Sequence, residues 1–336
     1  MAADLPYAKS REIVESLGTS NSDPISSLLS SRILTESERK RLSRIDTRAL
    51  ESAVESGIVA VPADEFGQQL AESLRPPLAL FAWGDKQCLL RPMIAIVGTR
   101  AASTYGRAVA QKFGEHFARS GVIVASGGAM GIDTCAHEGA LAAGGQTVAV
   151  LPGGVDVPQP PKNKGLFDRI RESGCLVSPY AVGSPAFDHR FEQRNHLIAA
   201  MSLCVVVVEA PSKSGALMTC SAAADLGRSV FVVPGSIDMP GFRGSHRLVR
   251  DGATLVDDPA QVLEEMGIES GASTEDRGQL TERQSAIMTA LSAEPQSAES
   301  IVPLVSASSA DILADLTMLE LEGYVIKSAM GYSVKP

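Results

Sequence analysis

The sequence lacks the residue patterns that mark several common classes of protein. Its five cysteines among 336 residues include no CxxC pair, so we expect reduced thiols and no disulfide bond. Five histidines and the absence of an HExxH motif argue against a metal site. No run of about 18 apolar residues occurs, and residues 1–18 carry acids without a hydrophobic stretch. We therefore expect a cytoplasmic protein with no membrane span, no signal peptide and no cofactor.

Two nucleotide-binding motifs are also absent. The loops "GTRAASTYG" and "GGAMGID" do not contain GxGxxG, and the strand that ends "VIVASGG" is not followed by an acidic residue. The segment "PSKSGALMT" lacks the Gly-Lys-Ser/Thr of a Walker A loop. The sequence therefore does not favour an NAD-dependent enzyme or a P-loop NTPase.

Charge is distributed unevenly along the chain, whose net charge is −9. Residues 1–70 hold 8 basic and 11 acidic side chains, a net charge of −3, and residues 71–257 hold 18 and 15, a net charge of +3. Residues 258–336 hold 4 basic and 13 acidic side chains, a net charge of −9. An anion-binding surface is therefore expected in the middle of the chain.

Apolar β-branched runs alternate with helix-forming segments in that middle part. The runs include "MIAIVG", "GVIVASGG", "TVAVLPGG", "LCVVVVEA" and "SVFVVPGS". Strands that are apolar on both faces are typical of a parallel sheet covered by helices on both sides. The pattern predicts an α/β fold with a doubly wound, mostly parallel sheet.

Most of the predicted strands are followed by glycine. The carboxyl ends of parallel strands form the edge at which open α/β sheets bind ligands, and glycine lets backbone N–H groups approach an anion closely. A single glycine loop would say little, but several on one edge predict a crest of phosphate-facing loops. The predicted loop residues are Gly98, Ser126, Gly127, Gly128, Gly153, Gly154, Ser214 and Gly215.

The stretch "ASGGAMGIDTCAHEGAL" places four side chains of chemical interest within six positions. If a helix begins near Gly131, Cys135 lies on an apolar stripe that packs on the sheet, and Asp133 and His137 are spaced to pair with each other. The convergent ligands of a zinc site are missing. We interpret the stretch as strand, glycine turn and helix. Asp133 then either accepts from a ligand hydroxyl or caps the helix.

Basic side chains stand at several predicted helix starts, where they oppose the helix dipole unless an anion lies nearby. A solvent-exposed face explains any one of them, but not comfortably all of them on one edge. Within "RFEQRNHLIAAMS", an aromatic residue lies beside arginines, which suits base stacking combined with phosphate contact on a single strand. The candidate binding residues in these segments are Arg100, Lys162, Lys164, Arg190, Phe191, Arg194, Asn195 and Lys213.

Over residues 70–265 the chain closely resembles the DprA/Smf family, the DNA-processing proteins of natural transformation. The resemblance rests on "IAIVGTR", "SGGAMGIDTCAHEGAL", "TVAVLPGGVD", "FEQRNHLIAAMS", "VVVVEAPSKSGALMT" and "LVRDGATLVDDP", in that order. It implies an extended Rossmann-like domain that binds single-stranded DNA without sequence preference. It also implies a homodimer that loads the RecA recombinase and protects incoming DNA, without an established catalytic activity.

The family's DNA pocket maps onto four positions of this chain, and a fifth matches a basic position before "SG". The four are Arg100, Phe191, Arg194 and Asn195, and the fifth is Lys213. The chain also departs from the family pattern, which puts its DNA affinity in doubt. The departures are Met130 for Arg, Gln159 for Tyr, Pro179 for Glu, His196 for Arg, and Ser245 with His246 for a Thr/Ser-Asn pair.

The flanking segments predict two smaller domains. Residues 1–70 contain helical stretches and resemble the SAM-like helical domain that precedes the Rossmann-like domain (71–268) in many family members. After a charged, polar linker (269–279), residues 280–336 follow a winged-helix plan of three helices and a hairpin. Because phosphate contact needs Lys or Arg and this tail is strongly acidic, we favour a protein-contact or regulatory role for it.

Two other functions remain open from the sequence. "LPGGVD" resembles the phosphate loop of nucleotide phosphoribohydrolases, although it lacks their Gly-Thr and the following Glu, and Glu209 at a strand end would be the candidate acid. A nucleotide sensor without catalysis would fit the same loops. Competition between mononucleotides and oligonucleotides distinguishes these functions from DNA binding.

Overall fold

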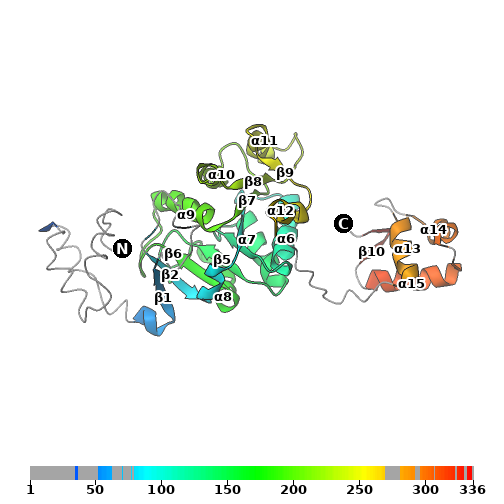
Figure 1. Cartoon of the computed structure of the whole chain (residues 1–336), viewed down its shortest axis with the longest axis horizontal. Coiled ribbons are helices and arrows are strands. Elements are labelled where there is room, and N and C mark those ends of the chain that lie inside the picture. Colours follow the sequence, from blue (N-terminus) through cyan, green and yellow to red (C-terminus); the bar gives the residue numbers. More distant parts are fainter. Residues whose placement is uncertain are drawn as a thin grey trace. The chain divides into compact units, whose positions relative to one another are not determined.

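The computed structural model describes residues 35–36, 52–62, 70, 77, 79–268, 281–291, 296–305, 307–321, 324–328 and 331–334. The chain divides into two compact units, Met1–Gly271 and Ala272–Pro336 (Figure 1). Most of the helical domain predicted over residues 1–70, and the whole predicted linker 269–279, lie outside the described residues. The predicted domain boundaries therefore stay predictions.

A nine-stranded sheet forms the centre of the first unit, in the order β1-β2-β6-β5-β4-β3-β7-β8-β9. The seven strands from β6 to β9 are parallel, whereas β1 and β2 add antiparallel at one edge. This confirms the doubly wound, mostly parallel sheet. The strands are β1 Ile58–Pro62, β2 Ala79–Gly84, β3 Met93–Val97, β4 Ile123–Ser126, β5 Thr147–Val150, β6 Cys175–Ser178, β7 Cys204–Val207, β8 Ser229–Val232 and β9 Thr254–Leu255.

Strand β1 lies inside the segment that we predicted as helical. Its sequence IVAVP is rich in β-branched residues, and Ile58 and Val61 are buried where the strand pairs with β2. Residues 58–62 therefore belong to the sheet and not to a separate helical domain. The sequence pattern missed this because a five-residue strand is short beside the helix-forming residues that precede it.

Helices cover both faces of the sheet (Figure 1). Side chains alternate along β3, so Ile94 and Ile96 pack with α6, α7 and α12, whereas Ala95 and Val97 pack in the cluster that holds α9 and α10. Helix α8 covers β5 and β6. The helices are α6 Thr104–Arg119, α7 Ile132–Ala142, α8 Lys164–Ser173, α9 Asp188–Met201, α10 Ala216–Asp225, α11 Arg243–Arg250 and α12 Pro259–Glu265.

The strand order reverses direction at β3. Strands β4, β5 and β6 follow β3 on one side, and β7, β8 and β9 lie on the other, with β3 and β7 paired from Ile94 with Cys204 to Val97 with Val207. In open α/β sheets, the crevice beyond the carboxyl ends of two such strands is the usual ligand site. The fold therefore places the candidate site between the loops that follow β3 and β7.

The second unit is a winged helix, as predicted. Helices α13 Glu282–Ala290, α14 Ala298–Val305 and α15 Ser309–Leu321 precede the hairpin of β10 Val325–Ser328 and β11 Gly331–Val334. Apolar side chains from all five elements form its core.

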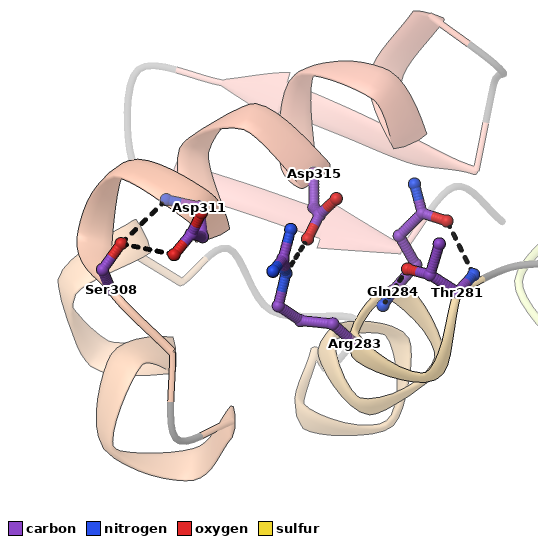
Figure 2. Close-up of polar contacts among 6 residues, drawn as sticks. All are labelled: Thr281, Arg283, Gln284, Ser308, Asp311 and Asp315. Atoms are coloured by element: carbon purple, nitrogen blue, oxygen red, sulfur yellow. Dashed lines mark hydrogen bonds and ion pairs between the residues drawn. The ribbon is translucent and has the colours of Figure 1, made fainter.

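Polar contacts fix the helix ends of the second unit (Figure 2). Gln284 accepts from the Thr281 backbone N–H at 2.9 Å and donates its own N–H to the Thr281 hydroxyl at 3.2 Å, a capping box that starts α13. The Arg283 guanidinium pairs with the Asp315 carboxylate and so joins α13 to α15. The Ser308 hydroxyl accepts from the Asp311 N–H at 3.2 Å at the start of α15.

In the part of the chain that the structure describes, no single helix is long and apolar enough to cross a membrane. The bent pair of α14 and α15 reaches that length and hydropathy only when its two helices are taken together.

Candidate functional site

A pocket of about 450 Å³ opens at the reversal point of the sheet. Four segments line it: residues 97–100 after β3, Ala129 and Asp133 around the start of α7, one face of α9, and residues 211–219, which run from the β7 loop into α10. Six of the binding and loop residues predicted from the sequence line this pocket, after β3, on α9 and after β7. They are Arg100, Phe191, Arg194, Asn195, Lys213 and Ser214, joined by Gly98 and Gly215 of the predicted loops.

Two guanidinium groups lie close to the Phe191 ring in this pocket. The Cζ atom of Arg100 lies 5.4 Å from the centre of the Phe191 ring, and that of Arg194 lies 5.8 Å from it. Arg100 is exposed, whereas Phe191 is half-buried. Cations at this distance over an aromatic ring are attracted to its π face. The ring is therefore held in place, and it leaves part of its surface open to a ligand.

Arg194 is turned inward, which the sequence did not predict. Its side chain is 5% exposed, and Nη1 donates to the carbonyl oxygens of Gly127 at 2.5 Å and Val150 at 3.1 Å. These carbonyls follow β4 and end β5, so the guanidinium fixes α9 against two strand ends. Burial lowers the pKa of Arg194, and the nearby Asp133 carboxylate opposes that effect. The residue supplies positive charge to the pocket wall while it holds the backbone.

Asp133 lies in the pocket lining, and its carboxylate is hydrogen-bonded to the glycine loop. Its carboxylate is buried and accepts from the backbone N–H groups of Gly127 at 3.2 Å and Ala129 at 3.3 Å. Burial raises its pKa, and Arg194 together with these hydrogen bonds lowers it. The expected pairing with His137 does not occur, because the imidazole Nδ1 contacts the Thr147 hydroxyl at 2.7 Å instead. Asp133 therefore holds the glycine loop together. It does not cap α7, because Gly131 is the N-cap and this helix start has no side-chain cap hydrogen bond, and the ligand role stays a prediction.

The start of α10 closes the other wall of the pocket. The Asn195 amide donates to the Gly215 carbonyl oxygen at 3.3 Å and accepts from Arg194 Nε at 3.1 Å. Gly215 caps α10, and Lys213 is exposed just before it. The first N–H groups of α10 donate to Ser214 and Gly215, so this helix start attracts an anion through the positive partial charge of its dipole. Position 215 has open space around it, so the backbone there is accessible.

Several predicted loop residues lie outside the pocket lining. Ser126 is fully buried and its hydroxyl donates to the Ile96 carbonyl oxygen at 2.6 Å, so it does not face a phosphate. A Cβ atom at Gly128 would lie 2.4 Å from the Phe167 ring, and this residue has a φ of 65°. Gly153 and Gly154 are covered by the backbone of residues 181–186. Glycine is required at these positions by close packing rather than by access to a ligand.

Lys162 and Lys164 stand at the start of α8, away from the pocket lining. Both are exposed, and the Lys164 ammonium pairs with Asp168 at 2.7 Å one turn along the helix. Met130 and His196, two departures from the family pattern, are exposed and also lie outside the lining. The structure does not bring these four residues to the candidate site.

Arg190 is likewise directed away from solvent. Its guanidinium Cζ lies 4.1 Å from the centre of the Tyr180 ring and 5.0 Å from the centre of the Phe187 ring. Its Nη1 donates to the Pro185 carbonyl oxygen at 2.9 Å. Its side chain is buried, so we correct its role from a direct phosphate contact to a packing residue. Phe187 was missed by the sequence analysis, although it precedes Phe191 by four residues and so shares its helix face. No sequence signal pointed to Tyr180.

Glu209, the candidate acid of the hydrolase alternative, has its carboxylate hydrogen-bonded within the protein. Its carboxylate is 4% exposed and accepts from the Ser103 N–H at 2.9 Å and the Ser103 hydroxyl at 2.7 Å. A Cβ atom at Gly106 or Gly241 would lie 2.2 Å or 2.5 Å from its oxygens. This enclosure at the start of α6 leaves no room for a substrate. Among the described residues, no three His, Cys, Asp or Glu side chains converge as metal ligands.

Comparison with known families covers both units of the chain. Residues 57–267 match the model of DNA recombination-mediator protein A, and residues 271–328 match the DprA winged helix domain. Protein Smf of Escherichia coli is 39% identical over 209 residues, which cover 61% of this chain and 56% of that protein. A putative DNA processing protein DprA of Mycobacterium tuberculosis is 43% identical over 193 residues, covering 57% of this chain and 50% of that protein. The chain thus spans about half the length of these two relatives.

Two solved structures share the fold. DNA processing protein A of Streptococcus pneumoniae superimposes with a TM-score of 0.68 at 31% identity, over 79% of this chain and 94% of that one. DNA processing protein A of Helicobacter pylori superimposes with a TM-score of 0.57 at 25% identity, over 62% of this chain and 95% of that one. Its structure concerns a single-stranded DNA binding mode. Together with the family model over more than half of the residues, these likenesses establish that the chain belongs to the DNA recombination-mediator protein A family, DprA or Smf.

Proposed function

We propose that this protein binds single-stranded DNA without sequence preference and acts as a recombination mediator. The observation that carries the proposal is Phe191, whose half-buried ring lies beside the guanidinium groups of Arg100 and Arg194 at the reversal point of the sheet. Every base has a π face, so stacking on an aromatic ring tolerates any sequence. The exposed Arg100 and Lys213 and the start of α10 supply positive charge for the adjoining phosphates.

The geometry favours a single strand over a duplex. Base stacking on Phe191 requires an unpaired base, and bases in a duplex are stacked on each other. The described helices of the winged helix carry Arg283 as their basic residue, and it is paired with Asp315. Groove-reading helices depend on Lys and Arg for phosphate contact, so this unit is poorly suited to duplex DNA.

Family membership supports a proposal for the partners and the setting. We propose a homodimer that loads the RecA recombinase onto single strands in the cytoplasm, with no catalytic reaction of its own. The related protein of Helicobacter pylori, studied for its single-stranded DNA binding mode, supports the choice of ligand. The enclosure of Glu209 removes the best candidate for an acid catalyst, so the hydrolase alternative is not favoured.

The test is a titration of the full chain with single-stranded and blunt duplex oligonucleotides of equal length at moderate salt. Clearly tighter binding of the single strand is expected, with similar affinity for unrelated sequences. Equal affinity for the duplex would contradict the proposal. Addition of nucleoside monophosphates serves as the control, because a nucleotide sensor or hydrolase would bind them in preference to the oligonucleotide, and a hydrolase would release the free base.

RecA loading is measured separately, as the rate at which RecA assembles on a strand precoated with single-stranded DNA-binding protein. The chain should raise that rate, and sedimentation of the free chain should give the mass of two copies. An unchanged rate with intact DNA binding would limit the function to DNA binding alone.

A further inference from the structure

Four side chains form a continuous stack beside the pocket. The Arg190 guanidinium contacts two rings, with its Cζ atom 4.1 Å from the centre of Tyr180 and 5.0 Å from the centre of Phe187. The His189 ring lies nearly parallel to Phe187, with 5.9 Å between the ring centres and 10° between the planes. Arg190 is buried, whereas Phe187 is 50% exposed and His189 is exposed. An aromatic ring is therefore held rigidly at the surface by a buried cation.

This stack continues the helix face that forms the pocket. Phe187 is the N-cap of α9 and precedes Phe191 by four residues, so the two residues are about one helical turn apart, roughly 6 Å along the axis. Asp188, one residue after Phe187, lines the pocket itself. The exposed aromatic surface thus adjoins the Phe191 site and needs no movement of the fold to reach a bound strand.

The charges on α9 differ between the two sides of the Phe191 row and favour one side for the phosphates. By helix geometry, Arg194 lies on one side of the Phe191 row, and Asp188 and Glu192 lie on the other. Phosphates are repelled by the two carboxylates and attracted to the side of Arg194 and Arg100. The sugar-phosphate backbone then follows the arginine side while the bases point to the aromatic row.

We propose that Phe187 and His189 form a second stacking platform, which takes the base next to the one stacked on Phe191. Arg190 is a positioning residue for this platform, because it packs against the inner side of Phe187 and is itself held by Tyr180 and the Pro185 carbonyl oxygen. The inference rests on the proposed function. It extends the binding site by one unpaired nucleotide on a surface outside the pocket lining.

The test compares full-length Phe187→Ala, Phe187→Trp and His189→Ala with the unmodified chain on thymidine oligonucleotides of increasing length. Phe187→Ala should weaken binding about 5- to 150-fold, the range for loss of one stacked base, with the salt dependence unchanged. It should also remove the gain in affinity that one added nucleotide brings to the shortest strand that binds. His189→Ala should cause a smaller loss.

Phe187→Trp restores a π face and reports on its contact. This variant should bind as tightly as the unmodified chain, and its added tryptophan fluorescence should be quenched by the oligonucleotide. Trp83, on β2, is the chain's own tryptophan, so the unmodified chain gives the background signal. Leu90→Ala is the matched control, because Leu90 is 59% exposed. It is the last residue of the short 3-10 helix Lys86–Leu90, which precedes β3 at the opposite edge of the sheet from the pocket.

Three outcomes separate this inference from the proposed function. Weaker binding by Phe187→Ala with quenching in Phe187→Trp supports the platform. Binding by both alanine variants that equals the unmodified chain at every length, or a Phe187→Trp signal that DNA does not change, overturns the platform alone. Failure of the unmodified chain to bind any single strand overturns the proposed function and the platform together. Thermal melting of each variant checks that the fold is intact.

Discussion

The Arg194 guanidinium occupies the space that a side chain at position 127 would need: a Cβ atom on Gly127 would lie 1.9 Å from Nη1. Arg194 donates to the carbonyl oxygens of Gly127 and Val150 and lies near the buried Asp133. The arginine of the candidate site is therefore part of the structure that holds two strand ends and α9 together.

Arg194→Ala should destabilise the first unit as well as reduce DNA binding. It leaves the carbonyl oxygens of Gly127 and Val150 without this donor and the buried Asp133 carboxylate without a nearby positive charge, which costs about 3–5 kcal/mol of unfolding free energy. For a unit of this size that corresponds to a lowering of Tm by roughly 6–20 °C. The loss should shrink in acid, because burial raises the pKa of Asp133 and the protonated carboxyl no longer needs the cation. The Tm of Arg194→Ala is measured by calorimetry, with Lys112→Ala as the control because Lys112 is exposed. An unchanged Tm would show that Arg194 does not hold the two strand ends and α9 together.

Arg100→Ala should act on DNA binding without loss of stability. Its side chain is exposed, so its removal should change the unfolding free energy by less than about 0.5 kcal/mol. Loss of one phosphate contact should flatten the slope of log affinity against log salt by roughly 0.7 on single strands. Lys86→Ala is the control, since Lys86 is exposed in the short 3-10 helix before β3, at the opposite edge. Equal slopes for both variants would place the phosphate elsewhere.

Phe191→Ala should weaken single-strand binding by about 1–3 kcal/mol with little change in the salt slope, because stacking involves no counterion release. The measurement is a titration at three salt concentrations. Phe191→Tyr should retain most of the affinity because it keeps the π face. A salt slope that falls with Phe191→Ala would mean that Phe191 acts only by positioning Arg100, whose guanidinium lies over its ring.

The buried His137 should make the first unit less stable in mild acid. Burial, aided by the charge of Arg194, lowers the pKa of His137 from 6.5 to about 3. Its Nδ1–H is assigned as the donor to Thr147, since the Thr147 hydroxyl itself donates to the Val124 carbonyl oxygen. The unfolded chain takes up a proton below pH 6.5 that the folded chain does not, so stability falls as pH falls toward 3.

Between pH 6.5 and pH 5 that loss amounts to about 2 kcal/mol of unfolding free energy. Denaturant unfolding at both pH values, for the unmodified chain and His137→Asn, isolates it from the titration of other groups. The variant should lose about 2 kcal/mol less over this interval. The same pH dependence in both proteins would show that His137 takes up its proton without unfolding.

Deletion of residues 279–336 should leave single-strand binding intact or make it modestly tighter at low salt, where screening is weakest. The described residues of the winged helix hold five acidic side chains and two basic ones, Arg283 and Lys327, and these two contact Asp315 and the Tyr332 ring. The first unit has its own core, so it should stay folded. Weaker binding by a truncated chain with an unchanged melting transition would show that the winged helix touches DNA.

Much of the fold could be predicted because its signals are local. Continuous β-branched runs specify buried parallel strands, and the glycines after them mark the carboxyl edge of the sheet, where open α/β folds usually bind ligands. The "FEQRN" segment, with "GTR" and "SKSG", was enough to predict Arg100, Phe191, Asn195 and Lys213 at one pocket. Strand β1 escaped prediction, because five residues carry little periodicity and their partner β2 lies some 20 residues further along the chain.

Tertiary structure decided which way the long side chains turn. Arg190 and Arg194 look alike in sequence to the exposed Arg100, yet one contacts two aromatic rings and the other hydrogen-bonds strand-end carbonyls. Helical periodicity specifies the face from which a side chain starts, but a flexible guanidinium reaches whatever acceptor or ring the neighbouring elements bring within range. The sequence by itself determined the sheet and the family, and it predicted Phe191 as the aromatic centre of the candidate site. Only packing decided which cations hold the structure and which remain open to an anion.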